Sequence, residues 1–265
     1  MATMPPLLVL LWVFSGIVQM SVLFLVFAKH HFRALPLFTI YIAFNLCQAA
    51  FLLFVYTHFG FLSSAARRMY WISEPLALTA QALAATELLY LLFRNYPGIW
   101  ALTWRLVVAA STIVIVYAAA SARTRPDWSL LIANRGYHLT FAVALICSLL
   151  LVRSYAIPVD PVYKAILAGF CVFSCTVFAA NTLLEALFVK RFPRSGEIWN
   201  YIEMVVFIGV QMAWAAALRH RIAADDKPAL FPPSTYERMS PEVNSRLRAL
   251  NDVLSKFLRL QVLRP

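Results

Sequence analysis

Ten carboxylate and amide side chains lie within stretches of the chain that are otherwise apolar. A charged side chain near the centre of a bilayer costs about 2.5–3.5 kcal/mol on insertion scales, so it usually faces a partner or a water-filled cavity. Amides need hydrogen-bond partners in the same surroundings. We therefore treat these residues as candidates for binding a ligand: Asn45, Gln48, Glu74, Gln81, Glu87, Asn181, Glu185, Asn200, Glu203 and Gln211.

Three of the carboxylates are expected at one end of the membrane. At about 1.5 Å per helical residue, Glu74, Glu185 and Glu203 lie within about two turns of the same face. Asn181 and Asn200 are expected nearby. If their helices adjoin, these side chains form an acidic pocket for a cation, a zwitterion or a small polar molecule. Taken singly, each glutamate fits equally well an interfacial residue that is hydrated or paired with a loop arginine.

Glu87 is expected nearer the opposite face but still inside the bilayer, at a depth comparable with Asn45 and Gln48. One interpretation is a ligand or proton site between the second and third spans. The other is a buried structural hydrogen bond, or an ion pair with Arg94 two turns further along. An intramembrane carboxylate is a functional hypothesis by default, which favours the first interpretation.

The elements that carry these residues follow from the composition. The 265 residues are 62% hydrophobic and 13% charged, with a mean hydropathy of +0.73. Soluble domains are about 45–50% apolar and about 25% charged. A span needs about 20 mainly apolar residues. We therefore predict an all-α membrane protein, a bundle of seven transmembrane helices at about 7–28, 36–58, 70–93, 99–120, 128–152, 162–189 and 197–218.

The connections between the spans are short and several are basic. Arg67 and Arg68 are expected in the loop before the third span. Arg123, Arg125 and Pro126 are expected in the loop between the fourth and fifth spans. The deep parts of those two spans look almost wholly apolar. The polar interior is therefore assigned to the second, third, sixth and seventh spans.

Residues 1–221 form the membrane domain in this interpretation, 222–239 a linker and 240–265 a tail helix. The tail helix begins at a Ser-Pro-Glu start signal. Its apolar positions recur with a spacing of four and three, which suits a short coiled coil with a second copy or a partner helix. Its basic residues suit a helix lying on the membrane equally well. The apolar positions are Val243, Leu247, Leu250, Leu254 and Phe257.

Several chemistries have no support in the sequence. The seventh span lacks a lysine for a retinal Schiff base, and metalloprotease, hydrolase and P-loop motifs are missing. We therefore predict no enzyme activity, cofactor or metal. The five histidines are expected at or near span ends, which argues against paired haem ligands: His30, His31, His58, His138 and His220.

The net charge of +11 comes mainly from loops and the tail. There it sets topology and meets the lipid bilayer, so we predict no nucleic-acid partner. The first span has no basic residue before it and is followed by Lys29 and Arg33. This predicts an N-terminus outside and a cytoplasmic C-terminus, although the loops other than the tail lean slightly the other way. The chain has no Asn-x-Ser/Thr acceptor, which favours a bacterial inner membrane over a glycosylated surface.

Three functions remain open on these grounds. The first is a receptor-like or sensory membrane protein that binds a small ligand or cation within the bundle and signals through the tail. The second is an accessory or scaffold subunit of a membrane complex, with its glutamates in helix–helix contacts. The third is a small proton- or cation-coupled transporter, although the chain lacks the paired broken helices typical of that class.

Overall fold

The computed structural model is all-helical over the residues it describes. No strand occurs in that part of the chain. The described residues are 5–60, 63–94, 96–124, 126–154, 157, 159–183, 195–220, 245, 248–253 and 256.

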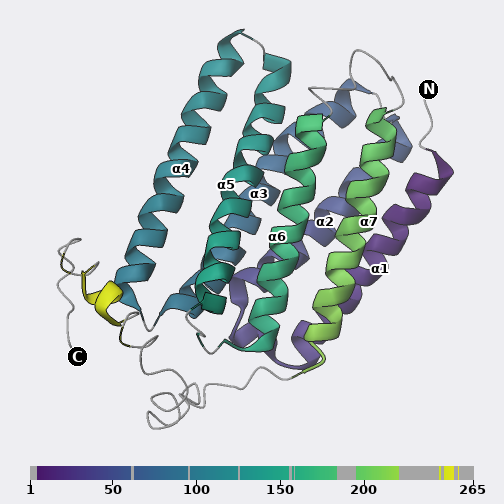
Figure 1. The fold of residues 1–265 in the computed structure, drawn as a ribbon. Coiled ribbons are helices and arrows are strands. Elements are labelled where there is room, and N and C mark those ends of the chain that lie inside the picture. Colours follow the sequence, from purple (N-terminus) through teal and green to yellow (C-terminus); the bar gives the residue numbers. More distant parts are fainter. Residues whose placement is uncertain are drawn as a thin grey trace.

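Seven long α-helices and one 3₁₀ turn make up the described membrane domain. They are α1 (Pro6–Ala28), η1 (His31–Arg33), α2 (Pro36–Phe59), α3 (Ser64–Phe93), α4 (Pro97–Thr124), α5 (Pro126–Ser154), α6 (Pro161–Leu183) and α7 (Ser195–Ala217). Figure 1 shows them side by side, with successive helices running in opposite directions. At 1.5 Å per residue they are about 35–45 Å long, longer than the roughly 30 Å hydrocarbon core of a bilayer.

Six of the helices are long and apolar enough to cross a membrane. These six segments are Pro6–Ala28, Pro36–Phe59, Ser64–Phe93, Ile132–Ser154, Pro161–Leu183 and Asn200–Ala217. In α4 the apolar stretch that meets the same criterion of composition is shorter, Gly98–Ile113. The expected all-α, multi-pass architecture is confirmed at this level.

The outward faces of the helices are apolar, as contact with lipid requires. On α1, the side chains of Leu10, Met20 and Phe24 are at least 60% exposed. Burying such side chains is worth about 1.5–3 kcal/mol each, so a continuous row of them facing water would be unfavourable. The row continues over other helices, which fits a surface covered by acyl chains.

The helices form a ring in chain order that α1 closes by packing against both α2 and α7. The most extensive contacts are those of α2 with α3, of α5 with both α4 and α6, and of α6 with α7. By contrast, α3 meets α4, α5 and α6 only sparsely. The side chains that bridge from α3 to these helices therefore have a large share in holding that side of the ring together.

Local start signals decide where α3 begins. The Oγ of Ser63 accepts a hydrogen bond from the backbone N–H of Ala66 at 3.0 Å, a typical N-cap. The helix therefore starts at Ser64, well before the expected start near residue 70, and Arg67 and Arg68 lie in its first turns. Their placement in a loop was wrong because a cap, and not hydrophobicity, sets this boundary.

The connection between α4 and α5 is also shorter than the sequence indicated. α4 continues to Thr124, so Arg123 is helical, and Pro126 is the first residue of α5. Proline is tolerated at the first helical position because its missing N–H would have no partner there. The expected basic loop is thereby reduced to Arg125, which lies outside the described residues.

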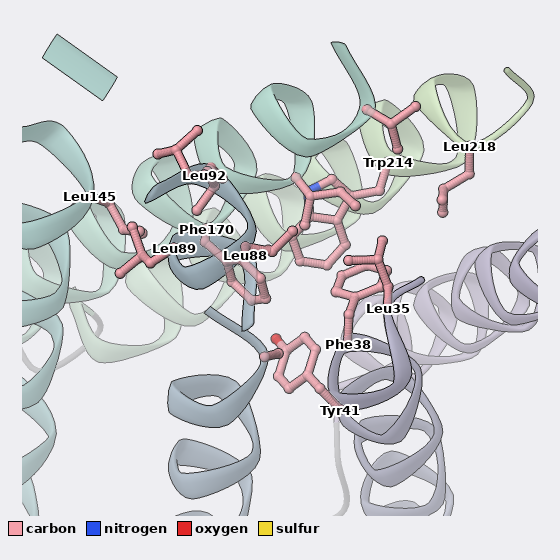
Figure 2. Packing of buried hydrophobic residues seen from close by; sticks show 14 of the residues in the cluster. Leu35, Phe38, Tyr41, Leu88, Leu89, Leu92, Leu145, Phe170, Trp214 and Leu218 are labelled. Carbon is pink, nitrogen blue, oxygen red and sulfur yellow. The ribbon is translucent and has the colours of Figure 1, made fainter. Parts of the chain in front are cut away.

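A buried aromatic group marks the centre of the bundle. Phe38 and Tyr41 of α2 meet Phe170 of α6 and Trp214 of α7, with ring centroids 4.9–6.4 Å apart. Figure 2 shows these four side chains gathered among leucines of α3 and α5. Aromatic pairs at such distances add about 0.5–1.5 kcal/mol each beyond their burial. This aromatic layer joins α2 to α6 and α7 across the ring.

Candidate ligand site within the helix bundle

The contact at the centre of the candidate site joins α3 to α5. The Nδ2 of Asn134 donates a hydrogen bond to Oε1 of Glu74 at 3.2 Å. Asn134 is buried. Glu74 is half-buried as a residue, but protein surrounds its carboxyl group. The contact adds α5 to the helices that supply polar groups to the interior, and Asn134 was not among the expected site residues.

The reason Asn134 was overlooked is its position. It lies only six residues into the expected span 128–152 (134 − 128) and beside Arg135, so it resembled a residue near the membrane surface. Because α5 begins at Pro126, Asn134 instead lies about two turns inside the helix. His138 lies one further turn inside and is buried, so its placement near a span end was wrong.

A second carboxylate lies near Glu74. Glu203 of α7 is half-buried and interacts electrostatically with Glu74, as do the phenol groups of Tyr41, Tyr56 and Tyr70. The electrostatic neighbours recorded for Glu74 are thus a second carboxyl group and tyrosine phenols. Two acidic groups are brought together in a low-dielectric interior beside tyrosines.

Buried polar atoms without partners lie deeper in the bundle than the carboxyl groups of Glu74 and Glu203, toward the aromatic layer. Tyr137 and His138 of α5, Ser174 of α6 and Gln211 of α7 each have such an atom, counted against the described residues. The atoms are Oη, Nδ1, Oγ and Oε1, respectively. A buried polar atom without a hydrogen bond costs about 1–3 kcal/mol. Several such groups together distinguish this region from an ordinary apolar core.

The depths of these layers can be compared along two helices. Phe141 packs on Phe170 of the aromatic layer, and Asn134 lies seven residues away from it (141 − 134). On α2, Gln48 lies seven residues from Tyr41 (48 − 41). Both separations correspond to about 10 Å. The carboxylate layer therefore lies about two helical turns from the aromatic layer, and the unpartnered polar atoms lie between the two layers.

Gln48 and Asn45 contact protein groups. The Nε2 of Gln48 donates to Oγ of Ser73 on α3 at 3.1 Å. The Nδ2 of Asn45 donates to the carbonyl oxygen of Tyr41 in its own helix at 2.9 Å. Gln48 thus lies beside the residue that precedes Glu74, and Asn45 lies between the carboxylate and aromatic layers.

The remaining amides differ in burial. Gln81 and Gln211 are almost fully buried, and each has one amide atom without a partner among the described residues. Asn181 is also buried, whereas Asn200 is exposed. Glu185 lies outside the described residues, so the structure brings together Glu74 and Glu203 of the expected group of three carboxylates.

Glu87 has a structural contact that its sequence position did not indicate. Its Oε1 accepts the backbone N–H of Leu37 at 3.0 Å, and its Oε2 accepts that of Phe38 at 2.9 Å. These amides belong to the first turn of α2, where a helix has no internal acceptors. A carboxylate at this end is also favoured by the helix dipole. The geometry therefore favours the structural interpretation of Glu87, a cap supplied by α3 to α2.

Two other helix ends near this side of the bundle are held by distant side chains. Nε2 of the buried His31 lies 3.0 Å from the carbonyl oxygen of Leu218, just beyond the end of α7. The Oδ1 of Asn251 in the tail accepts the backbone N–H of Gly98 in the first turn of α4 at 2.9 Å. Neither contact was predicted, because each joins residues far apart in the sequence.

The tail is helical where the structure describes it, at 245, 248–253 and 256. Burial raises the pKa of Tyr96, just before α4, and the nearby charge of Arg248 opposes that rise. Together with the Asn251 contact, this places the tail against the turn between α3 and α4. Leu250 is half-buried there. The other expected apolar positions of the tail, Val243, Leu247, Leu254 and Phe257, lie outside the described residues.

Comparison with protein-family models, with curated proteins and with solved structures found no match to this chain.

Proposed function

We propose that this protein is a receptor-like sensory membrane protein that binds a small ligand or cation between its helices. The observation that carries the proposal is the buried contact between Glu74 and Asn134, with Glu203 close by and unpartnered polar atoms below. Ionisable groups inside a membrane domain commonly mark ligand or ion sites. Groups from α3, α5 and α7 converge here, as they do in binding sites between the helices of bundles.

The helix α3 provides a physical connection from this site to the tail. It carries Glu74 in its first half and ends at Phe93, and the first turn of α4, which follows shortly after, contacts Asn251 of the tail through Gly98. Pro75 follows Glu74 directly and cannot donate the usual helical hydrogen bond. A change in the surroundings of Glu74 thus acts on a helix that is weakened at that point. In this proposal the tail passes the resulting shift to a partner.

The proposal includes seven crossings. The 28-residue α4 is about 42 Å long and packs extensively on α5, so it fits a seventh span even though its apolar stretch is shorter. In Figure 1, α1 begins at one end of the bundle and α7 finishes at the other. With the basic residues after α7, this supports an outside N-terminus and a cytoplasmic C-terminus. The membrane in this proposal is a bacterial inner membrane, which the missing Asn-x-Ser/Thr acceptor favours.

The direct test is a high-resolution map of the protein purified into lipid nanodiscs, with a bound antibody fragment to add mass. We expect non-protein density in contact with Glu74 or Asn134. A Glu74→Gln variant prepared in parallel should lose that density, and a Val205→Ala variant, altered at an exposed position of α7, should keep it. An interior in which Glu74, Glu203 and the unpartnered polar groups all contact protein would refute a ligand site.

A scaffold role is the second candidate, and the contacts of Glu87 and Gln48 favour it. Both side chains join α2 to α3 by hydrogen bonds, as expected if intramembrane polar groups serve packing alone. Native purification of the full chain and of a chain lacking residues 240–265 distinguishes the two functions. A stoichiometric partner lost with the tail, together with a closed interior, would favour the scaffold.

A further inference from the structure

Three side chains of the site, Glu74, Asn134 and Glu203, carry oxygens that can accept hydrogen bonds from a ligand. The Nδ2 of Asn134 already donates to Glu74, while its Oδ1 has no partner among the described residues. Asn134 is 92% buried, since 8% of its surface is exposed. The carboxylates of Glu74 and Glu203 add further acceptor oxygens when ionised. The site therefore calls for a ligand with several hydrogen-bond donors.

The charge of the site points the same way. The carboxyl groups of Glu74 and Glu203 interact electrostatically with each other. Uncharged groups lie beside Glu74 as well, namely Tyr56 from α2, Tyr70 from α3 and Asn134 from α5. Charges removed from water need a counter-charge close by, so a bound cation would relieve the repulsion between these carboxylates.

The type of cation follows from the other groups present. The described residues contain no cluster of three or more His, Cys, Asp or Glu side chains that could hold a metal ion. Instead, the phenol groups of three tyrosines interact electrostatically with Glu74. Aromatic faces attract organic cations, and one of these tyrosines, Tyr41, packs on Phe170 and Trp214 of the aromatic layer. These surroundings suit a cation with an apolar body.

We propose that Glu74, Asn134 and Glu203 hold the ammonium group of a small organic amine. A primary ammonium carries three N–H donors and one positive charge, and the three side chains supply acceptors and a compensating negative charge. Its carbon body extends toward Tyr41. This inference rests on the proposed function and specifies the ligand class of the same site.

The test uses the full chain in lipid nanodiscs and follows thermal unfolding. Methylammonium, butylammonium and 2-phenylethylammonium chlorides are titrated at constant ionic strength, with sodium butyrate as the anionic comparison. We expect at least one ammonium salt to raise the unfolding temperature saturably, as a ligand of the folded state does. In Glu74→Gln and in Glu203→Gln the half-saturating concentration should rise tenfold or more. Val205→Ala, an exposed apolar position on α7 outside the site, should respond like the unaltered protein.

Other outcomes overturn the inference. Absence of a saturable shift with all three ammonium salts would do so, as would an equal shift with butyrate or unaltered responses in both glutamine variants. Two separate glutamine variants are used so that poor folding of one leaves the other to decide. Density at Glu74 in the nanodisc map, without an ammonium response, would retain the proposed site and reject this ligand class. A closed interior would reject both.

Discussion

Replacing Glu87 tests whether an intramembrane carboxylate can serve as a helix cap from outside the helix. Both of its oxygens accept amides from the first turn of α2, at 2.9 and 3.0 Å. Glu87→Ala removes both acceptors and leaves the N–H groups of Leu37 and Phe38 without a partner. Glu87→Gln keeps one acceptor oxygen and turns an NH₂ group toward a backbone N–H. The two variants should therefore be destabilised to different degrees.

The magnitude follows from the two hydrogen bonds. A hydrogen bond to a charged group contributes about 1.5–3 kcal/mol, and loss of an ordinary helix cap costs about 0.5–2 kcal/mol. Glu87 is half-buried, so water can replace part of what is lost. We expect roughly 2–4 kcal/mol for Glu87→Ala and roughly half of that for Glu87→Gln. At about 2–4 °C per kcal/mol, the unfolding temperature should fall by roughly 4–16 °C in the alanine variant.

The assay combines thermal unfolding in detergent with amide hydrogen exchange. In Glu87→Ala, a peptide covering Leu37 and Phe38 should exchange faster than in the unaltered protein, while the middle of α2 should not. Tyr90→Phe is the control, because it removes one hydroxyl from an exposed side chain of the same helix. An unchanged unfolding temperature and unchanged exchange at these amides in Glu87→Ala would refute the cap. The interpretation of Glu87 as a ligand-binding residue would then be favoured again.

Two further predictions concern packing and the tail. Gly169→Ala should lower stability by about 1–3 kcal/mol in thermal unfolding, because the added methyl group would overlap the indole of Trp214; Gly209→Ala, where nothing lies within 4 Å, is the matched control and should be neutral or stabilising. Equal losses in the two variants would contradict this packing. Asn251→Ala should speed hydrogen exchange at the amide of Gly98, since its acceptor is lost. Unchanged exchange there would mean that the tail does not dock on α4 in solution.

The sequence was a sound guide wherever hydrophobicity alone decides the structure. Runs of about 20 apolar residues predicted the all-helical, multi-pass architecture, and the expected start of the second span at residue 36 coincides with the start of α2 at Pro36. The start of α3 was missed because it depends on one side-chain hydrogen bond at Ser63. A single polar residue outside the apolar run carries little weight in a hydropathy pattern, yet it fixes where the helix begins.

The candidate site could be predicted only in part. Glu74 stood out because a carboxylate in an apolar stretch is unusual, and Glu203 was expected at a similar depth. Asn134 gave no comparable signal, because an asparagine beside Arg135 resembles an ordinary surface residue. The role of Glu87 was beyond the reach of the sequence, since its partners are backbone amides that have no sequence signature.

The cap from Glu87 also has a consequence for how the protein is made. Residues 37 and 38 precede Glu87 by 50 and 49 positions, so α2 is synthesised well before its acceptor exists. During that interval the first turn of α2 must find water or lipid headgroups as acceptors, which favours keeping that end at the membrane surface. Once α3 has left the ribosome, Glu87 can accept the hydrogen bonds of Leu37 and Phe38, and the two helices can pair as an antiparallel hairpin. All the groups of this cap therefore lie in a segment that is synthesised before α4 to α7.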